Sequence, residues 1–191
     1  MELDFLNLEQ VLELLGQLLA DRGFHYEVVA IGGGSLVLLG LIERATKDLD
    51  LVALVHEDRL IAANPLPLNL RQASEEVGKA LGLGQDWLNI GPASLLELGL
   101  PHGFKNRLHT IQYGGLILHL AGRFDQICFK LYATVDQGAE SKHFVDLKSL
   151  NPSSEELEAA RRWCVTHDVS REFARELEQA LVAFGIGNGI A

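Results

Sequence analysis

Three consecutive glycines lie between two apolar segments, and this arrangement limits the fold more than any other feature of the sequence. Residues 25–31 (HYEVVAI) have the composition of a strand, and residues 35–44 (SLVLLGLIER) have that of a short apolar helix. Gly32-Gly33-Gly34 connects them. Glycines at such a turn let the backbone approach a ligand closely, and the start of a helix offers N–H groups to phosphate. The spacing matches neither the dinucleotide-binding fingerprint nor a P-loop, so the turn alone predicts only a strand-to-helix connection.

Two acidic residues open the next expected strand, residues 48–55 (DLDLVALV). Alternate residues of a strand point to the same face, so the carboxylates of Asp48 and Asp50 should project side by side. Adjacent carboxylates repel each other unless water solvates them or a cation bridges them. Twelve residues separate Ser35 from Asp48, which allows the glycine turn and the acids to meet at one end of a sheet. We therefore predict a site for Mg²⁺ (or Mn²⁺); the alternative is a pair of solvated acids at a strand end.

The remaining sequence predicts an α+β fold. Helical spacing of apolar residues predicts helices over residues 7–22, 68–81, 123–135, 141–150, 153–166 and 170–184. Strand patterns over residues 109–113 and 116–120 predict a hairpin around Gly114-Gly115. Residues 86–100 fit no single element, because Gly91 and Pro92 interrupt them. We predict a core over residues 1–122 and a helical C-terminal part over residues 123–191 packed on it, either as two domains or as one.

Charge and cysteine content narrow the classes of function. Sixteen Lys and Arg against 26 Asp and Glu give a net charge of −10, which argues against coating nucleic acid or anionic membrane through bulk charge. Cys128 and Cys164 show no CxxC spacing, so neither a zinc site nor a disulfide scaffold is expected. The sequence has no basic signal-peptide region at its start and no apolar stretch long enough to cross a membrane. We expect a cytoplasmic protein that does not associate with membranes.

Two isolated polar residues stand in apolar surroundings. Lys130 is the only charge in residues 127–135 (ICFKLYATV), so its side chain either extends to solvent or meets an anion. His119 is the only polar residue of the expected strand 116–120 (LILHL). Histidine titrates near neutral pH, which would suit a general base. The alternative is a histidine that is simply hydrogen-bonded or facing solvent.

Gly33-Gly34-Ser35 followed by Asp48-Leu49-Asp50 resembles the signature of the nucleotidyltransferase superfamily with the polymerase-β-like fold. The closer likeness is to its minimal prokaryotic branch, which includes the AbiEii-like toxins. Arg44-Ala45-Thr46-Lys47-Asp48 is similar to their R-x-T-x-D approach to the acids. Further weak similarities are Asp86-Trp87-Leu88-Asn89, Lys130 and Asp146-Leu147, so the resemblance covers roughly residues 28–150.

The resemblance implies a nucleotidyltransferase-like mixed sheet flanked by helices, and it assigns roles to several residues. It places the triphosphate on Gly33, Gly34 and Ser35 with Thr46, the metal ion on Asp48 and Asp50, and Lys130 over the phosphates. Many active members carry a third carboxylate on a later strand, where this sequence has only His119, with Asp125 following. Relatives also show a second acid about four residues before Asp146. This chain has Lys142-His143 there, so helix-surface or capping duty is an equal alternative for Asp146.

We predict an Mg²⁺-dependent enzyme that transfers a nucleoside monophosphate from an NTP to an RNA end or a protein hydroxyl. The resemblance further implies a toxin–antitoxin setting, with an antitoxin or another protein as partner. The missing third acid favours an alternative, a catalytically weakened module that binds a nucleotide or a partner. A structural domain without any ligand is the third hypothesis.

Overall fold

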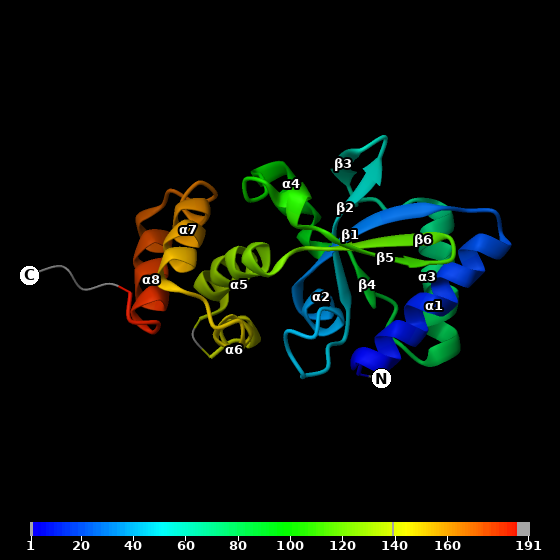
Figure 1. The fold of residues 1–191 in the computed structure, drawn as a ribbon, viewed down its shortest axis with the longest axis horizontal. Helices are drawn as coiled ribbons and strands as arrows, with labels where there is room; N and C mark the ends of the chain where they lie inside the picture. Colours follow the sequence, from blue (N-terminus) through cyan, green and yellow to red (C-terminus); the bar gives the residue numbers. More distant parts are fainter. Residues whose placement is uncertain (1, 139, 187–191) are drawn as a thin grey trace, which may run out of the picture. The chain divides into compact units, whose positions relative to one another are not determined.

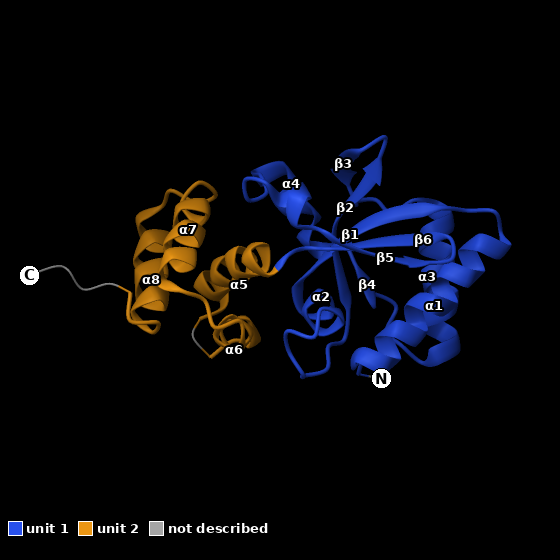
Figure 2. Ribbon diagram, viewed as in Figure 1, with its two compact units in different colours: residues 1–122 blue, residues 123–191 orange. Residues whose placement is uncertain are grey.

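The computed structural model describes residues 2–138 and 140–186. The chain divides into two compact units, residues 1–122 and residues 123–191 (Figure 2).

A mixed sheet of six strands forms the centre of the first unit (Figure 1). The strands are β1 (Tyr26–Ile31), β2 (Leu49–His56), β3 (Arg59–Ala62), β4 (Leu88–Asn89), β5 (His109–Tyr113) and β6 (Leu116–Leu120). Their order is β3-β2-β1-β6-β5, and β4 pairs with β2 beside this path. The β1–β6 and β2–β4 pairs are parallel, and the others are antiparallel. The predicted α+β fold, with a mixed sheet and flanking helices, is confirmed.

The hydrophobic core of this unit lies between one face of the sheet and two helices, α1 (Phe5–Asp21) and α3 (Leu68–Leu81). Val28 and Ala30 of β1 and Leu118 of β6 point into this core. Because side chains alternate along a strand, Glu27 and His119 point to the opposite face. The sheet therefore has one apolar face and one face that carries polar groups.

The helix after the glycines differs from the expectation at both ends. α2 spans Gly32–Leu38, so the glycines form its first turn, whereas the sequence pattern predicted a helix over residues 35–44. It ends early because Gly40 adopts a left-handed φ of 65°. The N–H of Leu41 then bonds to the carbonyl of Leu36 at 2.9 Å, which closes the helix end. The sequence pattern did not predict this stop, because apolar residues lie on both sides of Gly40.

Several short elements were not predicted. β3 follows a tight turn in which Glu57 and Asp58 have φ values of 48° and 60°. Glycine or asparagine normally supplies these angles, so the sequence carries no turn signal there. Residues 86–107 form β4, the 3₁₀ helices η1 (Gly91–Ala93) and η2 (Phe104–Arg107), and α4 (Ser94–Leu98). β2 begins at Leu49, so Asp48 lies immediately before the strand and not within it.

The second unit is helical, with α5 (Arg123–Gln137), α6 (Lys142–Ser149), α7 (Ser154–Cys164) and α8 (Arg171–Val182). Serines cap the last three helices, and α7 carries a full capping box between Ser153 and Glu156. α5 contacts each of the other three. Cys128 and Cys164 are buried free thiols. Among the described residues, none of the helices combines the length and apolarity that crossing a membrane requires.

Candidate functional site

The glycine turn lies directly against the acidic end of β2. Ile31, the last residue of β1, is paired with Asp50. Gly32 follows with a left-handed φ of 76°, and a Cβ added to it would lie 2.3 Å from Oδ2 of Asp50. A Cβ on Gly34 would lie 2.9 Å from the carbonyl oxygen of Asp48. Only glycine permits this approach, and the structure therefore brings the turn and the two aspartates together.

Two further side chains reach the same turn from the segment that precedes β2. A Cβ on Gly33 would lie 3.1 Å from Oγ1 of Thr46 and 3.2 Å from Nη2 of Arg44. Thr46 is buried, and its hydroxyl donates to the Asp48 carbonyl at 3.2 Å. Backbone hydrogen bonds between Leu3 and Thr46, 2.6 and 2.9 Å long, hold this segment in place. A cationic side chain thus lies beside the glycine turn.

Arg44 was part of the R-x-T-x-D resemblance but was not predicted as a site residue, because its distance from the turn depends on the path of residues 39–47. Ser35, which was predicted to contact the nucleotide, lies inside α2 and is fully buried. Its predicted role stays a prediction.

Asp48 and Asp50 are both half-buried, and Leu49 between them is fully buried. Asp50 lies on β2, with its side chain on the face of the sheet opposite the core. Asp48 precedes the strand, and its Oδ1 lies 3.3 Å from the hydroxyl oxygen of Thr46. Asp50 accepts a hydrogen bond from Nδ2 of Asn89 at 2.6 Å, and Oδ1 of Asn89 accepts from the N–H of Gly91 at 3.0 Å. Asn89 therefore orients the Asp50 carboxylate.

Asn89 was not predicted as a site residue. Its position depends on β4, a two-residue strand that pairs Asn89 with Asp50 in parallel. So short a strand, followed by Gly91-Pro92, has no periodicity from which to predict it.

The donor set at this end of β2 suits a hard divalent cation. Mg²⁺ binds through one or two carboxylates and usually completes its coordination with substrate phosphates and water. Asp48 and Asp50, two half-buried carboxylates beside the glycine turn, are ligands of this kind. Over residues 2–138 and 140–186, no group of three or more His, Cys, Asp or Glu side chains is arranged to hold a metal ion.

His119 lies on the same sheet face as Asp50. It is opposite Val29 on β1, and Ile31, two residues further along β1, is opposite Asp50. Nε2 of His119 is 2.5 Å from Oε1 of Glu27, and Nδ1 is 2.8 Å from the hydroxyl of Thr110. Both ring nitrogens are therefore hydrogen-bonded, which is one of the two alternatives predicted for this residue. A role for His119 as a base stays a prediction.

The other predicted residues lie in the second unit. Lys130 is only 3% exposed, and its Nζ donates to Oδ2 of Asp146 at 2.7 Å. Two alternatives were predicted for the Lys130 side chain, extension to solvent or contact with an anion. The structure shows the second, with the Asp146 carboxylate as the anion. Asp146 is 1% exposed, so the alternative that it lies on the surface of its helix is wrong. Asp125, in the first turn of α5, is also fully buried. Buried charges require partners, and here two helices contribute one each to an ion pair.

A glycine turn packed against two aspartates at the start of β2 is the arrangement that the resemblance to nucleotidyltransferases implies. Comparison with protein families agrees with this class. The model of the family described as nucleotidyltransferase of unknown function (DUF6036) matches residues 6–141, and the chain belongs to this family. The match extends from α1 beyond the end of α5. The chain matches no curated protein and no solved structure. The resemblance to AbiEii-like toxins stays a prediction.

Proposed function

We propose that this protein is a divalent-metal-dependent nucleotidyltransferase that moves a nucleoside monophosphate from an NTP to an RNA end or a protein hydroxyl. One observation carries the proposal: the first glycine of α2 is in contact with the Asp50 carboxylate, so a triphosphate on the turn would lie beside the acids. Family membership supports the reaction class.

Each residue of the proposed site would have a distinct role. Asp48 and Asp50 would hold Mg²⁺ or Mn²⁺, which when bound neutralises triphosphate charge and stabilises the leaving pyrophosphate. The backbone of Gly33 and Gly34 would receive phosphate oxygens, with Arg44 supplying positive charge next to Gly33. Thr46, whose hydroxyl oxygen lies 3.3 Å from Oδ1 of Asp48, and Asn89, which donates to the Asp50 carboxylate, would orient the two carboxylates.

Lys130 is proposed as a further phosphate ligand on the strength of the resemblance alone. Its ammonium group is held by Asp146 at 2.7 Å, which would fix the position of the cation within the second unit. Asp125 and Ser35 are retained as candidates on the same basis.

The acceptor is more consistent with a protein or a locally bound RNA end than with extended RNA. A net charge of −10 opposes broad, sequence-independent binding to a phosphate backbone. Bound metal would reverse the sign of the charge only at the site itself. A toxin–antitoxin setting, with an antitoxin as partner, is part of the proposal.

Asp48→Asn tests the proposed reaction. With Mg²⁺ or Mn²⁺, labelled NTP and a pool of cellular RNA and protein, the variant should transfer label at least about a hundredfold more slowly, because it loses a metal-binding charge. Asp58→Asn, in the exposed turn between β2 and β3, is the matched control and should leave transfer unchanged. Full transfer by Asp48→Asn, with an unchanged melting temperature, would contradict the proposal.

A nucleotide-binding module with weak or no transfer is the second candidate. His119, the one polar residue on the strand where many relatives carry an acid, has both ring nitrogens hydrogen-bonded to neighbouring strands. In this case NTP and Mg²⁺ would raise the melting temperature without label appearing in RNA or protein. A domain without a ligand would show no NTP-dependent shift.

A further inference from the structure

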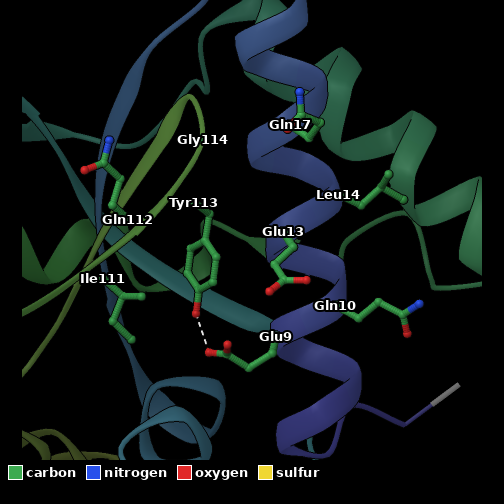
Figure 3. Close-up of a pocket in the computed structure, with 9 residues that line it drawn as sticks. All are labelled: Glu9, Gln10, Glu13, Leu14, Gln17, Ile111, Gln112, Tyr113 and Gly114. Atoms are coloured by element: carbon green, nitrogen blue, oxygen red, sulfur yellow. Dashed lines mark hydrogen bonds between the residues drawn. The ribbon is translucent and has the colours of Figure 1, made fainter.

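A cavity of about 730 Å³ lies in the first unit between α1 and the outermost strand, β5 (Figure 3). We name it the α1–β5 groove. Its lining residues are Glu9, Gln10, Glu13, Leu14 and Gln17 from α1, and Ile111, Gln112, Tyr113 and Gly114 from β5 and its turn. The groove is far along the sheet order from β2, which carries the acids, and no part of the proposed reaction uses it.

β5 is an edge strand that lacks the usual protection against pairing. In the described part of the chain it has β6 on one side and no strand on the other. All five residues pair regularly with β6, and the strand, HTIQY, contains neither proline nor lysine. Proteins normally blunt such edges with charges, proline or bulges. The opposite edge, β3, is shorter and begins with Arg59. A regular edge without lysine, proline or a bulge is a template for another strand.

The register shows which backbone groups of β5 point outward. Tyr113 and Leu116 face each other across the two-residue turn Gly114-Gly115, and such flanking residues form a hydrogen-bonded pair. Hydrogen-bonded and non-hydrogen-bonded pairs alternate in an antiparallel ladder. The N–H and C=O groups of Thr110 and Gln112 therefore point away from β6, toward the open edge.

One end of the groove is held rigidly by backbone contact. The N–H of Gly115 donates to the carbonyl of Gly16 at 2.8 Å. A Cβ on Gly16 would lie 1.8 Å from the carbonyl oxygen of Tyr113, so only glycine allows α1 to approach the hairpin this closely. The groove is thus preformed, which lowers the entropic cost of binding an extended segment.

The charges that line the groove are negative. Glu9 and Glu13 lie one helical turn apart on the groove side of α1 (Figure 3), and no Lys or Arg is among the lining residues. The hydroxyl of Tyr113 donates to Glu9, and burial together with this bond raises the pKa of Tyr113, so the phenol stays a neutral donor. Glu13 is left facing the groove as a carboxylate suited to a cationic side chain.

We propose that the α1–β5 groove binds an extended segment of a partner protein that carries lysine or arginine. The segment pairs with the outward groups of Thr110 and Gln112 as a further strand, and its basic side chains reach Glu9 and Glu13. A second copy of this chain fits less well, since pairing two β5 strands would bring Glu9 and Glu13 of both copies to one interface, in a protein with a net charge of −10.

The probe is a blocked six-residue peptide of alternating threonine and lysine, with an alternating threonine–glutamate peptide as its control. Both are added to the ¹⁵N-labelled full chain. The lysine peptide should shift the amide resonances of Thr110 and Gln112 and slow their hydrogen exchange, and the glutamate peptide should not. Absence of these local changes, or equal changes with both peptides, would overturn the proposal.

Three variants separate strand pairing from bulk charge. Glu13→Gln should weaken the Kd of the lysine peptide about threefold, whereas Glu97→Gln on α4, an exposed carboxylate outside the groove, should leave it unchanged. Gln112→Pro removes one outward N–H without touching the ladder to β6 and should abolish the exchange protection. Equal weakening by Glu13→Gln and Glu97→Gln would overturn the proposal, as would a dimer of the free protein in sedimentation. NTP transfer is a separate assay, so either proposal can fail alone.

Discussion

At the residue scale, the buried ion pair of Lys130 and Asp146 joins α5 to α6 in the helical unit. Both side chains are at least 97% buried, and Nζ and Oδ2 are 2.7 Å apart. A buried ion pair adds little stability over an apolar pair of the same volume. Loss of one partner, however, leaves the other charge without its counter-charge in a poorly solvated interior. The pair therefore fixes how α5 and α6 pack, whether or not it also meets phosphate.

Lys130→Met should lower the free energy of unfolding by about 3–5 kcal/mol, because Asp146 is then buried without its cation. The double variant K130M/D146L should recover most of this loss. Urea denaturation followed by circular dichroism measures both. A single variant as stable as the parent chain would show that the pair is not buried. A double variant that is stable but does not transfer label would separate a catalytic role from the structural one.

At the element scale, the junction between β1 and α2 decides the geometry of the site. β1 ends at Ile31, and the left-handed φ of Gly32 turns the chain so that α2 begins against Asp50. Any side chain at residue 32 meets two obstacles, the positive φ and the Asp50 carboxylate. Gly40, at the other end of α2, has a similar φ of 65° but no heavy atom within 4 Å of the site of a Cβ.

Gly32→Ala and Gly40→Ala form a matched pair for this reason. Gly40→Ala should cost about 1 kcal/mol of stability, from the left-handed conformation alone, and leave nucleotide binding unchanged. Gly32→Ala should cost more and should also displace Asp50, with loss of the NTP-induced rise in melting temperature. Thermal unfolding with and without NTP and Mg²⁺ measures both effects. Equal behaviour of the two variants would show that Gly32 acts only through its backbone angle.

At the scale of the whole molecule, the helical unit carries an acid-sensitive contact. Burial would raise the pKa of Glu156, but hydrogen bonds from the Arg123 side chain and the Ser153 backbone outweigh it and hold that pKa below its ordinary value of 4.5. A carboxyl with a lowered pKa in the folded state stabilises the fold above its unfolded pKa. That contribution is lost as pH falls through the folded value.

Stability should therefore decline below about pH 4.5, and Glu156→Gln should remove this part of the decline. Both side chains are partly exposed, so the effect should amount to about 1 kcal/mol or less. Urea unfolding at pH 3 and pH 6 measures it, and Glu155→Gln, an exposed neighbour without this contact, is the control. A variant that loses stability in acid as steeply as the parent chain would contradict the assignment.

The long elements could be predicted because their patterns are local. α3 and the β5–β6 hairpin have the predicted bounds, and the four helices of the second unit lie within two residues of theirs. The misses lie where the local pattern gives no clear signal of a turn or a helix end. Glu57 and Asp58 make a turn without glycine, and Gly40 ends α2 within an apolar run.

The sequence by itself determined the glycine turn, the two acids that follow it and the resemblance to nucleotidyltransferases, because these depend on residues that are close together in the chain. Only the tertiary structure decided which distant groups surround them. Asn89 reaches Asp50 through a two-residue strand, Arg44 lies beside Gly33, and Lys130 pairs with Asp146 from another helix. The physical reason is that such contacts join segments whose separation along the chain says nothing of their distance in space, and packing alone sets that distance.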